Sequence, residues 1–115
     1  MPKVTFESDP ENLVSGSYST GTGPVLRSAH MAVTKISFVK DKGAHEHAHP
    51  EQQVMYVLSG RLRVTCGEET YEVGPGEATS NPSDVPHAAM VQGDTTALSF
   101  KNQVAPIYEA TVRLA

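Results

Sequence analysis

Apolar and polar residues alternate along most of this chain, which is the pattern of β-strands rather than of helices. Within residues 61–66, Leu62 and Val64 fall on one side and the polar residues on the other. Residues 31–39 also combine apolar positions with interleaved polar ones. The pattern predicts strands at residues 4–7, 14–19, 31–39, 53–58, 61–66, 70–73, 77–80, 87–92, 95–101 and 107–114.

Glycine and proline separate these segments, with nine of one and eight of the other, and both residues mark turns. Residues 21–24, Gly-Thr-Gly-Pro, are therefore predicted to form a loop. Residues 53–58 are apolar almost without interruption, which is typical of a strand covered on both faces. No segment has a convincing helical stripe. About nine to eleven short strands predict an all-β sandwich or barrel.

Composition narrows the class of protein further. The chain has 115 residues, 38% hydrophobic and 19% charged, which suits one domain with its own core. A net charge of -4 without a basic stripe argues against a nucleic-acid partner. No apolar run approaches the roughly 20 residues of a membrane helix, and no signal peptide is visible, so we expect a cytoplasmic protein. Cys66 is the single cysteine and is expected to fill the core.

Three histidines, His45, His47 and His49, alternate just before the strand predicted at 53–58. On an extended backbone their side chains would point to one face. Neutral imidazoles close together are what a divalent transition metal binds, and Gln53 adds an amide oxygen. A solvated, histidine-rich turn is the alternative interpretation, but the alternating spacing before an apolar strand favours a metal site.

His87 is the expected source of a further ligand, because two adjacent histidines do not complete a metal site. It follows Val85 and Pro86, which hold its backbone extended. Four of the five histidines thus fall in two segments whose backbone conformation is restricted by neighbouring turn residues.

Two spaced patterns around these histidines resemble the two motifs of the cupin superfamily. The first contains His47-Ala48-His49, three residues, Gln53, six residues and Gly60. The second places these residues at the family's spacing: Gly76, Pro82, Asp84, His87 and Val91.

The match departs from the family's motifs at four positions. Gln53 replaces a glutamate, Asp84 a glycine and Val91 an asparagine, while the opening glycine falls at Gly43, two positions from its usual place. The resemblance implies a jelly-roll barrel, or double-stranded β-helix, as one domain over residues 1–115. The two motifs cover residues 43–60 and 76–91.

The resemblance also implies a ligand set, namely His47, His49, Gln53 and His87. The spacing to Gly60 leaves His45 outside this set, as a partner of a ligand, a catalytic acid–base group or a solvated bystander. All four ligands are neutral, so the metal keeps its full charge and acts as a stronger Lewis acid. About two positions of an octahedral ion stay open for substrate or water. Iron, manganese, nickel, zinc and copper all suit such ligands.

Two classes of function follow from this site. One is a metal-dependent enzyme on a small polar molecule, either a dioxygenase or an isomerase or lyase. Among small single-domain cupins, the His-x-His, Pro and Gln variant found here resembles proteins that open or isomerise unsaturated uronates, whose last strand carries Asp-x-Phe-x-x-x-Arg. Here Leu98, Phe100 and Val104 occupy those positions, so only the Phe is kept. The alternative is a non-catalytic module that binds a small ligand or metal, or whose metal only stabilises the barrel.

Strand parity predicts what surrounds the metal. Met55, Val57, Ala89 and Val91 share the parity of Gln53 or His87, so an apolar pocket or ordinary core is expected. The polar groups considered for the mouth of the barrel are Arg27, His30 and Arg63.

The opposite parity of the same strand predicts a partner. Val54, Tyr56 and Leu58 would form an apolar outer face, which needs cover. Because small cupins pair their sheets, the resemblance implies a homodimer.

Overall fold

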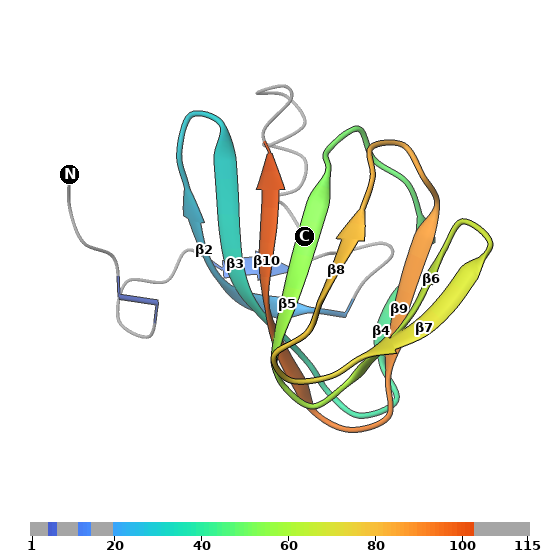
Figure 1. The fold of residues 1–115 in the computed structure, drawn as a ribbon. Coiled ribbons are helices and arrows are strands. Elements are labelled where there is room, and N and C mark those ends of the chain that lie inside the picture. Colours follow the sequence, from blue (N-terminus) through green and yellow to red (C-terminus); the bar gives the residue numbers. More distant parts are fainter. Residues whose placement is uncertain (1–4, 7–11, 15–19, 103–115) are drawn as a thin grey trace.

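The computed structural model describes residues 5–6, 12–14 and 20–102. These residues form β-strands and no helix, so the predicted all-β class is confirmed (Figure 1). None of them forms a helix long and apolar enough to cross a membrane. The strand expected at 107–114 and all but one residue of that expected at 14–19 lie outside the described residues, while residues 5 and 6 of that expected at 4–7 are described and form no strand. The strands are β1 Asn12–Val14, β2 Thr22–Arg27, β3 Met31–Phe38, β4 Gly43–His47, β5 Gln53–Ser59, β6 Leu62–Cys66, β7 Glu69–Val73, β8 Ala78–Asn81, β9 His87–Val91 and β10 Thr95–Asn102.

The strands form two antiparallel sheets that face each other. The larger has the order β1-β2-β3-β10-β5-β8 and the smaller the order β4-β9-β6-β7. Neighbours in space are mostly not neighbours in sequence, as the jelly-roll topology requires. Figure 1 shows the two layers close together at one end and farther apart at the other, where β8 and β10 end.

The inner faces change from apolar to polar along the strands. Near the narrow end, Ile36, Ala97 and Val57 stand in one register row of the larger sheet. They face a row of the smaller sheet in one buried core, made of Leu62, Val73 and Val91. Each fully buried apolar side chain of this size contributes about 1.5–3 kcal/mol, so the narrow end holds most of the core.

At the wide end the row across the larger sheet is polar except at Ala32. Register pairs connect Arg27 with Ala32, Ala32 with Lys101, Lys101 with Gln53, and Gln53 with Asn81. Directly opposite residues on adjacent strands share a face of the sheet. We call this inner row the polar row, and it faces the strand ends that carry His47 and His87.

Two local predictions were wrong. Residues 21–24 are not a loop, because β2 already begins at Thr22. Gly23 is used for close approach, since a Cβ there would clash with the carbonyl oxygen of Lys35. Strand β5 is not covered on both faces by the described residues: Val54, Tyr56 and Leu58 are 36%, 41% and 41% exposed.

The close approach of β2 to β3 gives a stability prediction. Gly23→Ala should lower the free energy of unfolding by about 1–3 kcal/mol, because the backbone of Lys35 must move away from the added methyl group. Urea unfolding measures the change. Gly93→Ala is the matched control, since nothing lies within 4 Å of a Cβ at that position. Equal stability of the two variants would contradict the packing argument.

Candidate metal centre

Three histidines from two distant segments meet at the wide end of the barrel. His47 is the last residue of β4, His87 the first of β9, and the two are directly paired across these strands. His49 follows two residues later, and its carbonyl oxygen accepts a hydrogen bond from the backbone nitrogen of Asp84 at 2.8 Å. Nitrogens of the three rings lie within 4.8 Å of one another. The structure therefore confirms that these three side chains cluster.

Each of the three rings is oriented by a backbone carbonyl. The Nδ1 atoms of His47, His49 and His87 contact carbonyl oxygens two residues away, at 2.6, 2.8 and 2.9 Å. A carbonyl only accepts, so Nδ1 carries the proton and Nε2 keeps its lone pair. The Nε2 atoms of His49 and His87 are buried and have no hydrogen-bond partner among the described residues. Buried lone pairs of this kind fit a divalent transition metal.

Burial also keeps the rings neutral. Burial is the largest cause, and together with the nearby charge of Lys101 it lowers the pKa of His49 from 6.5 to about 4. Burial is likewise the main cause that lowers the pKa values of His47 and His87, against the raising effect of their carbonyl hydrogen bonds. At neutral pH the three imidazoles are thus in the form that binds a metal.

Gln53 begins β5 and points into the barrel, where it is buried. Its amide nitrogen donates a hydrogen bond to Ser99 Oγ at 2.7 Å. This bond holds the amide in one orientation and leaves the oxygen, the atom that binds metals, to other partners. Coordination by Gln53 stays a prediction.

His45 does not join the cluster. Its side chain is exposed, and its carbonyl oxygen is the acceptor for His47 Nδ1. The register with β9 shifts between Ala44 and His47, so a bulge breaks the alternation of faces. The expectation that all three histidines of this segment share one face was therefore wrong. The role of His45 as an acid–base group stays a prediction.

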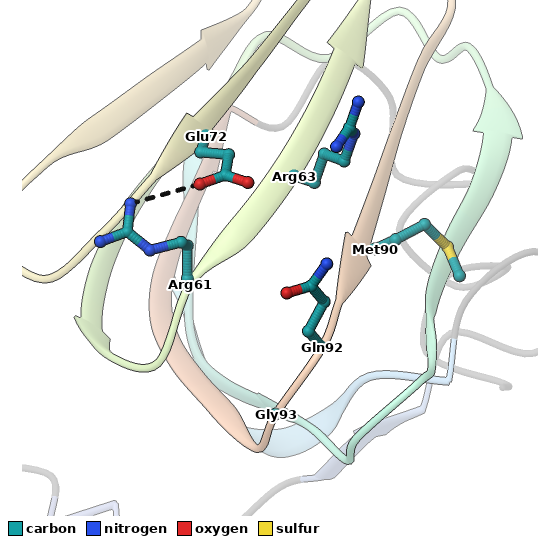
Figure 2. Close-up of a pocket in the computed structure, with 6 residues that line it drawn as sticks. All are labelled: Arg61, Arg63, Glu72, Met90, Gln92 and Gly93. Carbon is teal, nitrogen blue, oxygen red and sulfur yellow. Dashed lines mark ion pairs between the residues drawn. The ribbon is translucent and has the colours of Figure 1, made fainter.

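The residues expected around the metal separate into core and surface. Met55, Val57 and Val91 are buried in the main core, and Ala89 packs against it. His30 is exposed. Arg63 lies on the outer face of β6, where Figure 2 shows it beside a shallow pocket lined by Arg61, Arg63, Glu72, Met90, Gln92 and Gly93. Of the three polar groups considered, Arg27 alone stands in the polar row.

The last strand weakens the likeness to uronate-processing proteins. Leu98 and Phe100 pair with Tyr56 and Val54, whose side chains are exposed. They therefore lie on the outer face of the larger sheet, away from the histidines. The inner face of β10 presents Ser99 and Lys101 instead.

Sequence reasoning missed three polar residues near the histidines. Glu51 is fully buried, with Oε1 3.7 Å from His49 Nδ1. Asn81 and Lys101 flank Gln53 in the polar row. The parity of β10 does place Lys101 on the face of Ser99, but its level relative to Gln53 depends on strand register, which a single sequence does not reveal.

Comparison with known proteins agrees with this geometry. The family model described as a cupin domain matches residues 36–100. Comparison with curated protein sequences finds no match. An RmlC-like cupin from Shewanella frigidimarina is similar over 94% of this chain and 96% of its own, with a TM-score of 0.78 and 20% identity.

Two further solved structures share the fold. KdgF from Halomonas sp. is 18% identical over 73% of this chain and 79% of its own, with a TM-score of 0.67. TT1209 from Thermus thermophilus is 24% identical over 67% and 76%, with a TM-score of 0.63. Identities this low establish the architecture and carry no activity across.

The lowered pKa values predict that the metal-free protein loses stability in mild acid. The unfolded chain protonates its histidines near 6.5, whereas folded His49 resists protonation until about 4. The unfolded state therefore gains protons first as the pH falls. Between about pH 7.5 and pH 5, His49 alone should lower the free energy of unfolding by on the order of 2 kcal/mol.

Urea unfolding of chelator-treated protein at both pH values measures this loss. His49→Gln should remove part of the pH dependence, whereas His30→Gln, at an exposed site, should leave it unchanged. The same pH dependence in wild type and His49→Gln would show that His49 is not the group responsible.

Proposed function

This chain belongs to the cupin domain family, and on that premise we propose that it is a metal-dependent enzyme acting on a small polar molecule with a carboxylate or enol group. The buried, unpartnered Nε2 atoms of His49 and His87 carry the proposal. A buried polar atom without a partner is costly, so a ligand common to both rings accounts for them. The reaction classes it supports are those of a dioxygenase and of an isomerase or lyase.

The proposed metal ligands are His47, His49 and His87 through Nε2 and Gln53 through its amide oxygen. When bound, the metal supplies a Lewis acid that polarises a substrate oxygen. The carbonyl hydrogen bonds at Nδ1 hold the three rings in place, and Ser99 holds the amide of Gln53. Iron, manganese, nickel, zinc and copper remain the candidate ions, because imidazole and amide ligands suit each of them.

A non-catalytic cupin that binds a small ligand or a metal is the second candidate. It uses the same ligands and needs no group to move a proton. Tyr71 is a residue whose hydroxyl could move a proton, but that hydroxyl is already hydrogen-bonded to Thr79. The exposed position of His45 also favours this candidate. Turnover of a substrate by the metal-loaded protein separates the two functions.

We further propose that the protein is cytoplasmic and that residues 1–115 form one domain. Two copies of this domain associate through the outer face of the larger sheet. Val54, Tyr56 and Leu58 are exposed on β5, and Phe100 and Leu98 stand beside them on β10. A continuous apolar patch on a sheet favours association. The symmetric form of such a contact is a dimer about a twofold axis.

The metal proposal predicts the metal content of protein purified without added metal. Elemental analysis should find near one equivalent of one transition metal per chain in wild type. The metal should be lost in His49→Ala and His87→Ala, because each removes a buried ligand nitrogen. His45→Ala is the matched control and should keep its metal, since this ring is exposed outside the cluster. Wild-type protein without metal, even after incubation with each candidate ion, would refute the proposal.

The dimer proposal predicts a mass of twice 12.3 kDa in light scattering. Tyr56→Glu with Leu58→Glu should give the monomer, because charge on an apolar contact must be desolvated. Met90→Glu changes an exposed side chain on the other sheet and should leave the dimer intact. A monomeric wild type at micromolar concentration would contradict the proposal.

A further inference from the structure

The polar row crosses the larger sheet beside the histidine cluster, and Lys101 stands at its centre. Thr95, Ala97 and Ser99 are buried on the inner face of β10, and Lys101 continues that alternation. It is directly paired with Gln53 on one side and Ala32 on the other, both buried. A lysine is rarely placed on the inner face of a barrel unless its charge has a partner.

Several groups of the site act on this amine. Burial lowers the pKa of Lys101, Glu51 raises it and Arg27 lowers it. The positive charge of Lys101 in turn lowers the pKa values of His47, His49 and His87. The amine is therefore within electrostatic range of all three rings.

Among the described residues, the balance of charge around Lys101 is positive. Lys101 and Arg27 are cations, and in the part of the chain that the structure describes Glu51 is the carboxylate whose charge acts on Lys101. The four proposed metal ligands are neutral, so a bound divalent ion adds two positive charges that the ligands do not offset. Charges removed from water require opposite charges nearby. An anionic ligand would restore the balance.

Asn81 flanks Gln53 on the side opposite to Lys101. Its side chain is 3% exposed, and Oδ1 has no hydrogen-bond partner among the described residues. A buried amide oxygen needs a donor, which a hydroxyl group supplies. Two strand spacings separate Asn81 from Lys101, or about 10 Å between backbones, and both side chains lie on the inner face of the sheet.

From this arrangement we propose that Lys101 binds the carboxylate of a small hydroxy acid beside the metal ligands, while Asn81 accepts a hydrogen bond from its hydroxyl group. The inference rests on the proposed function, because it assigns the substrate class of that site. Gln53 and the three histidines lie between or opposite the two residues, so the bound molecule faces the metal position. Lys101 acts here as an anchor for the substrate.

Isothermal titration calorimetry with glycolate, the smallest hydroxy acid, tests the anchor. Glycolamide, its uncharged analogue, should bind wild type at least about tenfold more weakly, as expected when a desolvated charge pair is lost. Lys101→Met should weaken glycolate binding by a similar factor. Lys42→Met removes the same charge from an exposed turn and should bind glycolate as wild type does. Lys101→Gln serves as a second variant, with circular dichroism confirming the fold of each.

Comparing the binding of glycolate with that of acetate, which lacks the hydroxyl group, tests the role of Asn81. Wild type should prefer glycolate to acetate, and Asn81→Ala should lose that preference while still binding acetate. An unchanged preference in Asn81→Ala would remove Asn81 from the proposal.

Metal content measured on the same samples separates this inference from the proposed function. If Lys101→Met keeps its metal and binds glycolate as wild type does, the anchor is wrong and the metal centre stands. If wild type contains no metal but binds glycolate through Lys101, the metal centre is wrong and the anchor stands. Equal affinity of wild type for glycolate and glycolamide, or no binding of glycolate, would overturn the inference.

Discussion

The direct pairing of His47 with His87 across β4 and β9 is the constraint on which the rest of the site depends. It brings together residues forty positions apart in the chain, and the hydrogen bond from Asp84 to the carbonyl of His49 ties the two loops beside them. Because each Nδ1 is bound to a carbonyl of its own segment, the ring orientations are set by local backbone. A metal would then meet rings that need little reorganisation.

The polarity of the inner faces explains why the site lies at the wide end. Near the narrow end, apolar rows from both sheets pack into one core. Toward the wide end the rows gain hydroxyl, amide and charged groups, which hydrogen-bond one another or face the histidines. The apolar core that stabilises the barrel therefore lies at one end, and the polar groups of the candidate site lie at the other, beside the histidines.

Sequence reasoning recovered the features that depend on spacing and missed those that depend on register. Period-two alternation located the main strands, and the spacing of two motifs identified the three clustered histidines. It could not show the bulge that turns His45 outward, because an extra residue in a ladder leaves no mark in hydrophobic periodicity. The sequence also could not show that Lys101 pairs directly with Gln53, because that pairing depends on the register between strands far apart in the chain.

The departures from the family's motifs differ in what they change in the structure. Asp84 replaces a glycine and has a φ of 62°, a left-handed conformation that aspartate tolerates better than most residues. The loop therefore keeps its shape and its hydrogen bond to His49. Gln53 in place of glutamate changes the charge of the site instead.

With a neutral amide at Gln53, the carboxylate of this segment stands two residues earlier, at Glu51, fully buried beside His49 and close to Lys101. A glutamate ligand would offset part of the charge of the metal directly. Here the negative charge lies within electrostatic range of a lysine instead, so a metal held by the histidines would face an environment that favours an anion. The glutamine at position 53 and the lysine paired with it on the neighbouring strand are thus two parts of the same electrostatic arrangement.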